Sequence, residues 1–161
     1  MYIRLLFIVL ISVIPFLQAQ KKSISEPSES IVENERIIGE YEKLIDKYPD
    51  KKELHYNLGN IKYLTGKLEK AIENYNSAIL NKDKKQKAHA LYNLGNAYNK
   101  MGDLDKSIQA YKEALDILPE DSDIRYNYEL SKLMLQQQSS NEEQNQQDKN
   151  EEQNQQDKNQ E

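Results

Sequence analysis

Apolar residues in the middle of the chain recur at the spacing of an α-helix. Leu94, Tyr98 and Met101 follow one another at four and three residues, and a second set with the same spacing begins after Gly102. This spacing places apolar side chains on one face of a helix. Because glycine takes the left-handed conformation that ends a helix without a Cβ clash, Gly102 is expected to separate two antiparallel helices.

The same pattern occurs twice. Residues 57–60 read NLGN and so do residues 93–96, which lie 36 positions later (93 minus 57). A further glycine follows seven residues after the glycine of each tetrad, at Gly66 and Gly102. The repetition predicts two copies of one helical hairpin. The predicted repeats are residues 52–85 and 88–121.

Small residues mark the expected contact between the two helices of a hairpin. Gly95 in the first helix and Ser107 in the second are expected to face each other, which would let the two backbones approach closely. Tyr98 and Tyr111 are expected to fill the wider parts of the same interface.

Fragments of the pattern flank the two repeats. Residues 31–50 carry apolar residues at second-helix positions, followed by Pro49, and are interpreted as half a repeat. Downstream, a Tyr-Asn pair recurs in phase at residues 126–127, but Glu129 stands where the glycine would be. Residues 121–136 are therefore predicted to form a capping helix on which no further helix packs closely. The expectation is an all-α fold of six helices.

The two repeats resemble tetratricopeptide repeats (TPRs). The TPR pattern is Trp-x2-Leu-Gly-x2-Tyr, then Ala-x3-Phe, then Pro. The second repeat matches it with LYNLGNAY at residues 91–98, SIQAY at residues 107–111 and Pro119. The resemblance implies a short solenoid of antiparallel helix pairs within residues 31–136.

The first repeat departs from the pattern at two positions. It has Lys62 where the tyrosine would fall and Asp83 where the proline would fall. Two extra residues stretch the repeat to 36, and the loop at residues 82–87 is expected to be looser than in most TPRs.

Residues 1–19 have the features of an export signal. Arg4 and the terminal amine precede an apolar run at residues 5–17, shorter than the roughly 20 residues that span a bilayer. We expect cleavage after Ala19, with residues 20–30 as a linker, and an uncleaved membrane anchor is the alternative. Either way, the remainder is expected to lie in the periplasm.

The C-terminal residues 137–161 form a low-complexity tail rich in Gln, Asn and Glu. The segment NEEQNQQDK at residues 141–149 is repeated at residues 150–158. It contains too little apolar surface to offset the entropy of ordering, so disorder is predicted. Seven acids and two lysines after residue 135 account for the whole net charge of −5. The rest is neutral overall, which argues against nucleic acid as a partner.

The sequence offers no constellation for catalysis. Cysteine is absent, and the two histidines, His55 and His89, occupy different phases of the repeats without an acidic cluster beside them. No nucleophile is spaced near a base, and no phosphate-binding glycine loop occurs. We therefore expect no enzyme activity, no metal and no cofactor.

The TPR resemblance implies a concave groove that binds a protein or peptide, lined by the first helix of each pair. The residues at those phases combine tyrosine contact area with amides that both donate and accept hydrogen bonds. The candidate groove residues are Tyr56, Asn60, Tyr63, His89, Tyr92, Asn96, Asn99, Asp123 and Tyr126. The alternative is that Asn60 and Asn96 serve the fold alone.

Taken together, the export signal, the few TPRs, a last helix ending in YNYELSKLMLQQQ and the acidic Gln-rich tail resemble the TPR proteins of bacterial aerotolerance (Bat) operons. That resemblance implies an envelope complex with von Willebrand A-domain membrane proteins. The leading hypothesis is therefore a non-catalytic adaptor of the cell envelope. The alternatives are a self-associating structural component and an accessory subunit that modulates a partner enzyme.

Overall fold

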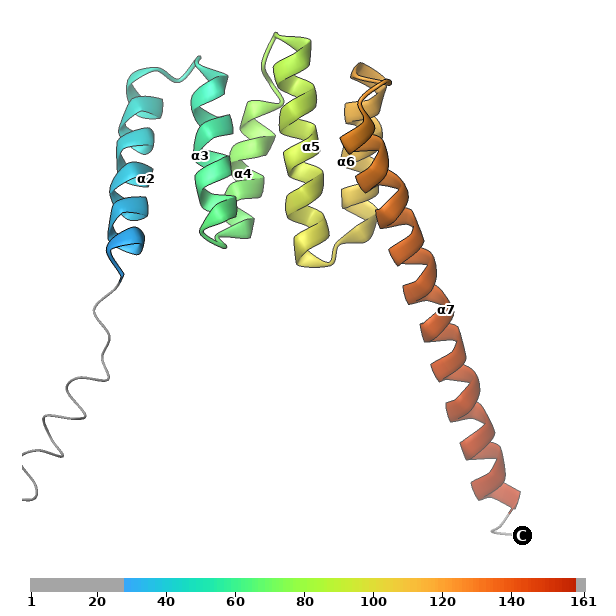
Figure 1. Cartoon of the computed structure of the whole chain (residues 1–161). Helices are drawn as coiled ribbons and strands as arrows, with labels where there is room; N and C mark the ends of the chain where they lie inside the picture. Colours follow the sequence, from blue (N-terminus) through green and yellow to red (C-terminus); the bar gives the residue numbers. More distant parts are fainter. Residues whose placement is uncertain (1–27, 159–161) are drawn as a thin grey trace, which may run out of the picture. The chain divides into compact units, whose positions relative to one another are not determined.

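A computed structural model describes residues 28–158 of the chain, and every secondary-structure element there is a helix (Figure 1). The expected all-α class and the six helices are confirmed for these residues. The helices are α2 (Glu29–Lys47), α3 (Lys52–Leu64), α4 (Leu68–Ala78), α5 (Lys84–Met101), α6 (Leu104–Ile117) and α7 (Ser122–Lys158).

The predicted export signal lies outside the described residues. Within residues 28–158, every helix falls short of the combination of length and apolar character that crossing a bilayer requires. The chain divides into two compact units, Met1–Ile37 and Ile38–Glu161, so that the boundary falls inside α2. Both hairpins and the cap helix belong to the second unit.

The hairpins form as the repeat predicted. Helix α3 packs against α4 and α5 against α6, while α4 contacts α5 and α6 contacts α7 (Figure 1). Gly66 and Gly102, with φ of 77° and 81°, turn the chain inside each hairpin. The Gly102 N–H donates to the Asn99 carbonyl at 3.0 Å, which satisfies one of the free carbonyls at the end of α5.

The close contact inside each hairpin is made by a glycine and a tyrosine. A Cβ atom added to Gly59 would lie 2.6 Å from the Tyr75 ring, and one added to Gly95 would lie 2.5 Å from the Tyr111 ring. The expectation that Gly95 faces Ser107 stays a prediction. Ser107 is buried nearer α7, with its Oγ 3.4 Å from Ser131 Oγ. The glycine makes room for an aromatic ring, because a tyrosine reaches further across the interface than a serine.

The connection between the two repeats is more ordered than the sequence suggested. Asp83 accepts a hydrogen bond from the Gln86 N–H at 2.9 Å and caps α5, which begins at Lys84. The expectation of a loose loop at residues 82–87 was wrong for its last four residues. The extra residues of the 36-residue repeat spacing lie in α5 and not in the loop, since α5 has 18 residues and α3 has 13.

Helix α7 caps the second repeat. Ile124 and Ser131 are both buried, at 1% and 0% exposure, on the side that packs against α6. Glu129, at the position of the hairpin glycines, is exposed. Since even a Cβ atom at the equivalent Gly95 would overlap a tyrosine ring, a glutamate here excludes another helix packed in the same way.

The described part of α7 extends beyond residue 136, where the cap helix was expected to end, and reaches Lys158. Gln, Glu and Lys are good helix formers, and the Gln138 side chain donates to Glu142 one turn later at 3.1 Å. A helix of this composition with no tertiary support is marginal in water. Disorder of residues 137–161 in solution therefore stays a prediction.

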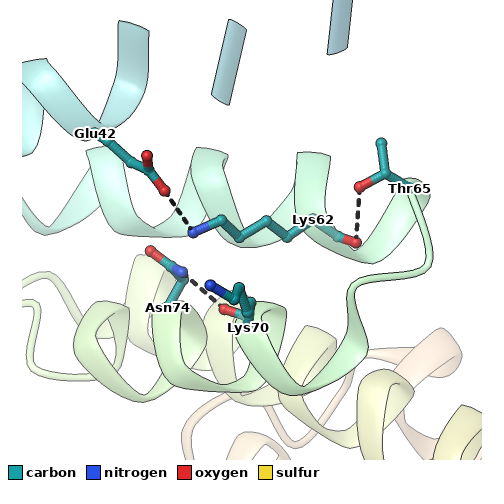
Figure 2. Close-up of polar contacts among 5 residues, drawn as sticks. All are labelled: Glu42, Lys62, Thr65, Lys70 and Asn74. Carbon is teal, nitrogen blue, oxygen red and sulfur yellow. Dashed lines mark hydrogen bonds and ion pairs between the residues drawn. The ribbon is translucent and has the colours of Figure 1, made fainter. Parts of the chain in front are cut away.

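Lys62 is the residue at which the first repeat departs most from the TPR sequence pattern, and its side chain is buried. It is 8% exposed, and its Nζ lies 3.1 Å from Oε1 of Glu42, which comes from α2 and is 55% exposed (Figure 2). The Lys62 carbonyl accepts from Thr65 Oγ1 at the end of α3 (Figure 2). The half repeat thus supplies the counter-charge for a lysine that replaces the expected tyrosine.

We expect Glu42→Ala to lower the free energy of unfolding by about 1–2 kcal/mol, because it leaves a buried ammonium without its carboxylate. The effect stays below the 3–5 kcal/mol of a fully buried pair, since Glu42 is half exposed. Lys62→Tyr, which restores the TPR residue, should be neutral or stabilising. Urea denaturation of the full chain measures both. A cost of Glu42→Ala that persists in the Lys62→Tyr background would contradict this account.

Candidate functional site

A hydrogen-bonded network of asparagine and tyrosine side chains crosses from the first repeat to the second. Asn60 Oδ1 accepts from Tyr75 OH at 2.9 Å and from Asn93 Nδ2 at 2.9 Å. Asn93 Nδ2 also donates to Tyr56 OH at 3.2 Å. The carbonyl oxygen of Asn60 therefore already accepts two hydrogen bonds from inside the protein, which is its full capacity.

The same network recurs one repeat later and reaches α7. Asn96 Oδ1 accepts from Tyr111 OH at 2.7 Å and from Asn127 Nδ2 at 3.1 Å. Asn127 Nδ2 also donates to Tyr92 OH at 3.1 Å. The recurrence shows that α7 corresponds to α3 and α5, the first helices of the two repeats, and lies in register with them.

Burial of the two network tyrosines favours their neutral form. Tyr75 and Tyr111 are each 1% exposed. Desolvation raises the pKa of Tyr111 to about 12, and it also raises the pKa of Tyr75 well above the ordinary value of 10.0. Both hydroxyls are donors in the network, so ionisation would remove the protons that bind Asn60 and Asn96.

The free energy of unfolding is expected to fall as the pH rises from 10 towards 12. The unfolded tyrosines lose their protons near pH 10 while the folded ones retain them to about pH 12. The unfolded state then binds fewer protons, and stability is lost by up to about 1.4 kcal/mol per pH unit for each tyrosine. Urea denaturation at several alkaline pH values measures the slope. An equal slope in Tyr75→Phe/Tyr111→Phe would show that other groups cause it.

Two adjacent pockets open beside this network. The first has a volume of about 250 Å³ and the second about 270 Å³. The first is lined by Asn60, Tyr63, Leu64, Tyr75, Asn93 and Asn96. The second is lined by Tyr63, Asn96, Asn99, Lys100, Tyr111, Asn127 and Leu130. Because Tyr63 and Asn96 line both, the pockets form one continuous surface, called the groove below.

Four of the candidate residues from the sequence line the groove: Asn60, Tyr63, Asn96 and Asn99. Tyr56 and His89 line a smaller pocket of about 180 Å³ with Glu53 and Gln86. Tyr126 is 68% exposed near the start of α7, where Asp123 is also exposed. Tyr92 is half-buried, with its ring 5.9 Å from that of Tyr111. Contact of any of these residues with a partner stays a prediction.

Sequence reasoning missed seven residues of the groove, and three of them, Leu64, Lys100 and Leu130, take no part in the network. Leu64 is 80% exposed and Leu130 is 40% exposed. Lys100 Nζ lies 4.8 Å from the centre of the Tyr63 ring, so its charge is held beside the second pocket. Leu64 and Lys100 occupy the same phase of the two repeats, 36 residues apart (100 minus 64), and Leu130 occupies the phase of Asn96 on α7. Comparing all positions at these phases would have found them.

The part of the chain that the structure describes holds no group of three or more His, Asp or Glu residues that could bind a metal. Both histidines are half-buried on helices, as expected for helix-surface residues.

Residues 53–120 match the family model for the tetratricopeptide repeat. The match spans both hairpins, which are therefore similar to TPRs. The fold resembles the crystal structure of MamA, at 23% identity with a TM-score of 0.59, over 66% of this chain and 61% of that one. It also resembles MamA from Desulfovibrio magneticus RS-1, at 19% identity and a TM-score of 0.59, over 71% of this chain and 63% of that one.

A third similar structure is the N-terminal domain of stress-induced protein-1 (STI-1) from C. elegans, at 21% identity and a TM-score of 0.53. The match covers 57% of this chain and 76% of that one. This chain spans less than two thirds of either MamA chain. No curated protein matches the sequence. TPR folds are typical of non-catalytic scaffolds that bind other proteins, and no enzyme family is indicated.

Proposed function

We propose that this protein is a non-catalytic adaptor that holds a segment of a partner protein in the groove. The observation that supports this most is Leu64, a large apolar side chain left 80% exposed at the edge of a pocket. Amide groups lie beside it. A concave site that combines apolar surface with a few polar groups is the usual form of a binding site.

We further propose that the adaptor works in the cell envelope. The export signal expected at residues 1–19 supports this location. The resemblance to the aerotolerance TPR proteins suggests a complex with von Willebrand A-domain membrane proteins. Cell fractionation of the full chain, with and without residues 1–19, tests the location. Recovery of both forms in the cytoplasm would contradict it.

Self-association by continued stacking of repeats is less favoured. A further repeat would stack on the outer face of α7, where Glu129, Lys132 and Gln136 are all exposed. Glu129 and Lys132 pair with each other at 3.1 Å. Stacked repeats bury apolar faces on each other, and the charged pair and the amide on this face are typical of a cap, with Leu133 as the apolar residue exposed beside them. A monomer at all concentrations in light scattering is expected.

We expect Leu64→Ser to weaken partner binding by tenfold or more, which is the loss typical of an interface residue that matters. Leu80→Ser is the matched control, because Leu80 is 68% exposed and lines neither pocket of the groove. Both substitutions should leave stability nearly unchanged, since both side chains are largely exposed. The measurement is capture of envelope proteins from detergent extracts on full-length baits. Equal capture by Leu64→Ser and Leu80→Ser would reject the groove as the binding surface.

A further inference from the structure

The exposed apolar residues of α7 lie at groove positions. Tyr126, Leu130, Leu133 and Met134 are 68%, 40%, 51% and 39% exposed. They follow the α5 groove-phase residues Tyr92, Asn96, Asn99 and Lys100 by 34 positions each (126 minus 92). Leu130 lines the second pocket directly.

Glu129 is exposed one turn from both Tyr126 and Leu133, and Lys132 is exposed further round the helix. The four apolar residues recur at i, i+4, i+7 and i+8 and so form one stripe along α7. At about 1.5 Å per residue this stripe is about 12 Å long. Leu130 joins the stripe to the second pocket, so the stripe extends the groove at one end.

The groove offers a ligand both acceptors and donors: among the described residues, Asn99 and Asn127 use only their Nδ2 atoms, so their Oδ1 atoms are free to accept. The Oδ1 atoms of Asn60 and Asn96 each accept two internal hydrogen bonds. Among the described residues, Asn60 Nδ2 has no hydrogen-bond partner, and Lys100 is the single charged residue that lines either pocket. A ligand that complements these two donors must bring acceptors, and a carboxylate suits Lys100.

Because the oxygens of Asn60 and Asn96 already accept two hydrogen bonds each, these two amides do not hold an extended ligand. An amide side chain holds an extended backbone by donating to one carbonyl and accepting from one N–H. Asn60 and Asn96 cannot accept in this way without breaking their bonds to Tyr75 and Tyr111. A helix presents only side chains to a groove, because its backbone groups are bonded internally.

We propose that the partner segment is an acidic amphipathic helix. Its apolar face lies on the stripe of Leu130, Leu133 and Met134, and a carboxylate binds Lys100. This inference rests on the proposed function and specifies the chemistry of the partner.

Selection from a displayed library of random peptides, four helical turns long, tests it. The baits are the full chain, Lys100→Glu, and the matched control Lys112→Glu, whose lysine is exposed on α6 and lines neither pocket. Wild type and Lys112→Glu should select peptides with apolar residues at i, i+3 or i+4, and i+7, and with Asp or Glu beside that face. Lys100→Glu should select Lys or Arg at the same place. A selected peptide should lose tenfold or more in affinity for Leu130→Ser/Leu133→Ser.

Selected peptides that lack helical periodicity, or an acidic preference that Lys100→Glu leaves unchanged, would overturn the proposal. If such peptides are nevertheless lost with Leu64→Ser, the groove still binds a partner and only the inferred chemistry is wrong. If no peptide is selected by any bait, the acidic helix is rejected. The envelope capture with Leu64→Ser and Leu80→Ser then decides separately whether the groove binds a protein at all.

Discussion

Replacing Tyr111 with alanine is expected to lower the free energy of unfolding by about 3–5 kcal/mol, the usual cost of truncating a buried aromatic residue. The Tyr111 ring is 1% exposed and occupies the space left open by Gly95. Its hydroxyl donates to Asn96 at 2.7 Å, so truncation also removes one of the two bonds to that amide. Since ring and hydroxyl are lost together, the estimate belongs at the upper part of this range. Urea denaturation followed by circular dichroism measures it.

Two further variants separate the causes of this loss. Tyr111→Phe removes only the hydroxyl and should cost about 1 kcal/mol, the net value of one hydrogen bond. Tyr126→Ala removes a tyrosine that is 68% exposed and should change stability by no more than about 0.5 kcal/mol. A loss below about 1 kcal/mol for Tyr111→Ala would mean that the ring is not part of the hairpin core.

The dependence of the fold on Tyr111 affects how the groove is tested. Tyr92 and Asn96 belong to the same network, because Asn96 accepts from Tyr111 and Tyr92 accepts from Asn127. Substituting either one would lower stability together with any binding. Leu64, Lys100 and Leu130 are exposed and take no part in that network, so their substitution reports on the groove alone.

The repeated glycines made most of the fold predictable. Gly66 and Gly102 adopt positive φ, as turns inside a helical hairpin require. The identical tetrads at residues 57–60 and 93–96 placed the two first helices in register, and Glu129 marked the cap. These features are local in sequence, and they recur at the same positions in each repeat.

The contacts between elements were less predictable. The ion pair between Lys62 and Glu42 joins residues that are 20 positions apart in the sequence. It has no equivalent in the second repeat, so the repeat pattern did not predict it. The pairing of Gly95 with Tyr111 was open to prediction. The two glycines and the two ring partners, Tyr75 and Tyr111, recur at the same offset of 36 (111 minus 75).

The groove was predictable in position but less so in chemistry. Of the residues chosen by repeat phase, Asn60, Tyr63, Asn96 and Asn99 line the two pockets. Phase alone did not show that two of the amide oxygens are already occupied, since that depends on where the hydroxyls of Tyr75 and Tyr111 reach. The free surface therefore includes the Asn60 amide N–H groups, the Asn99 and Asn127 oxygens, one lysine and exposed apolar side chains.

Gly95→Ala and Gly39→Ala are expected to change stability in opposite directions. Both glycines lie inside helices, α5 and α2, where alanine is favoured by about 1 kcal/mol. At Gly39 a Cβ atom would meet nothing within 4 Å, so the substitution should stabilise by about 0.5–1 kcal/mol. At Gly95 it would lie 2.5 Å from the ring of Tyr111, whose hydroxyl is bonded to Asn96 and prevents the ring from moving away.

Overpacking of this kind costs about 1–3 kcal/mol, so the net effect of Gly95→Ala is a loss of up to about 2 kcal/mol after the helix preference of about 1 kcal/mol is subtracted. The two variants should thus differ by roughly 0.5–3 kcal/mol in urea denaturation. Gly95→Ala in the Tyr111→Phe background should cost less, because the ring is then free to shift. Stabilisation by Gly95→Ala in the wild-type background would show that the close approach of glycine to tyrosine is not what holds the hairpin together.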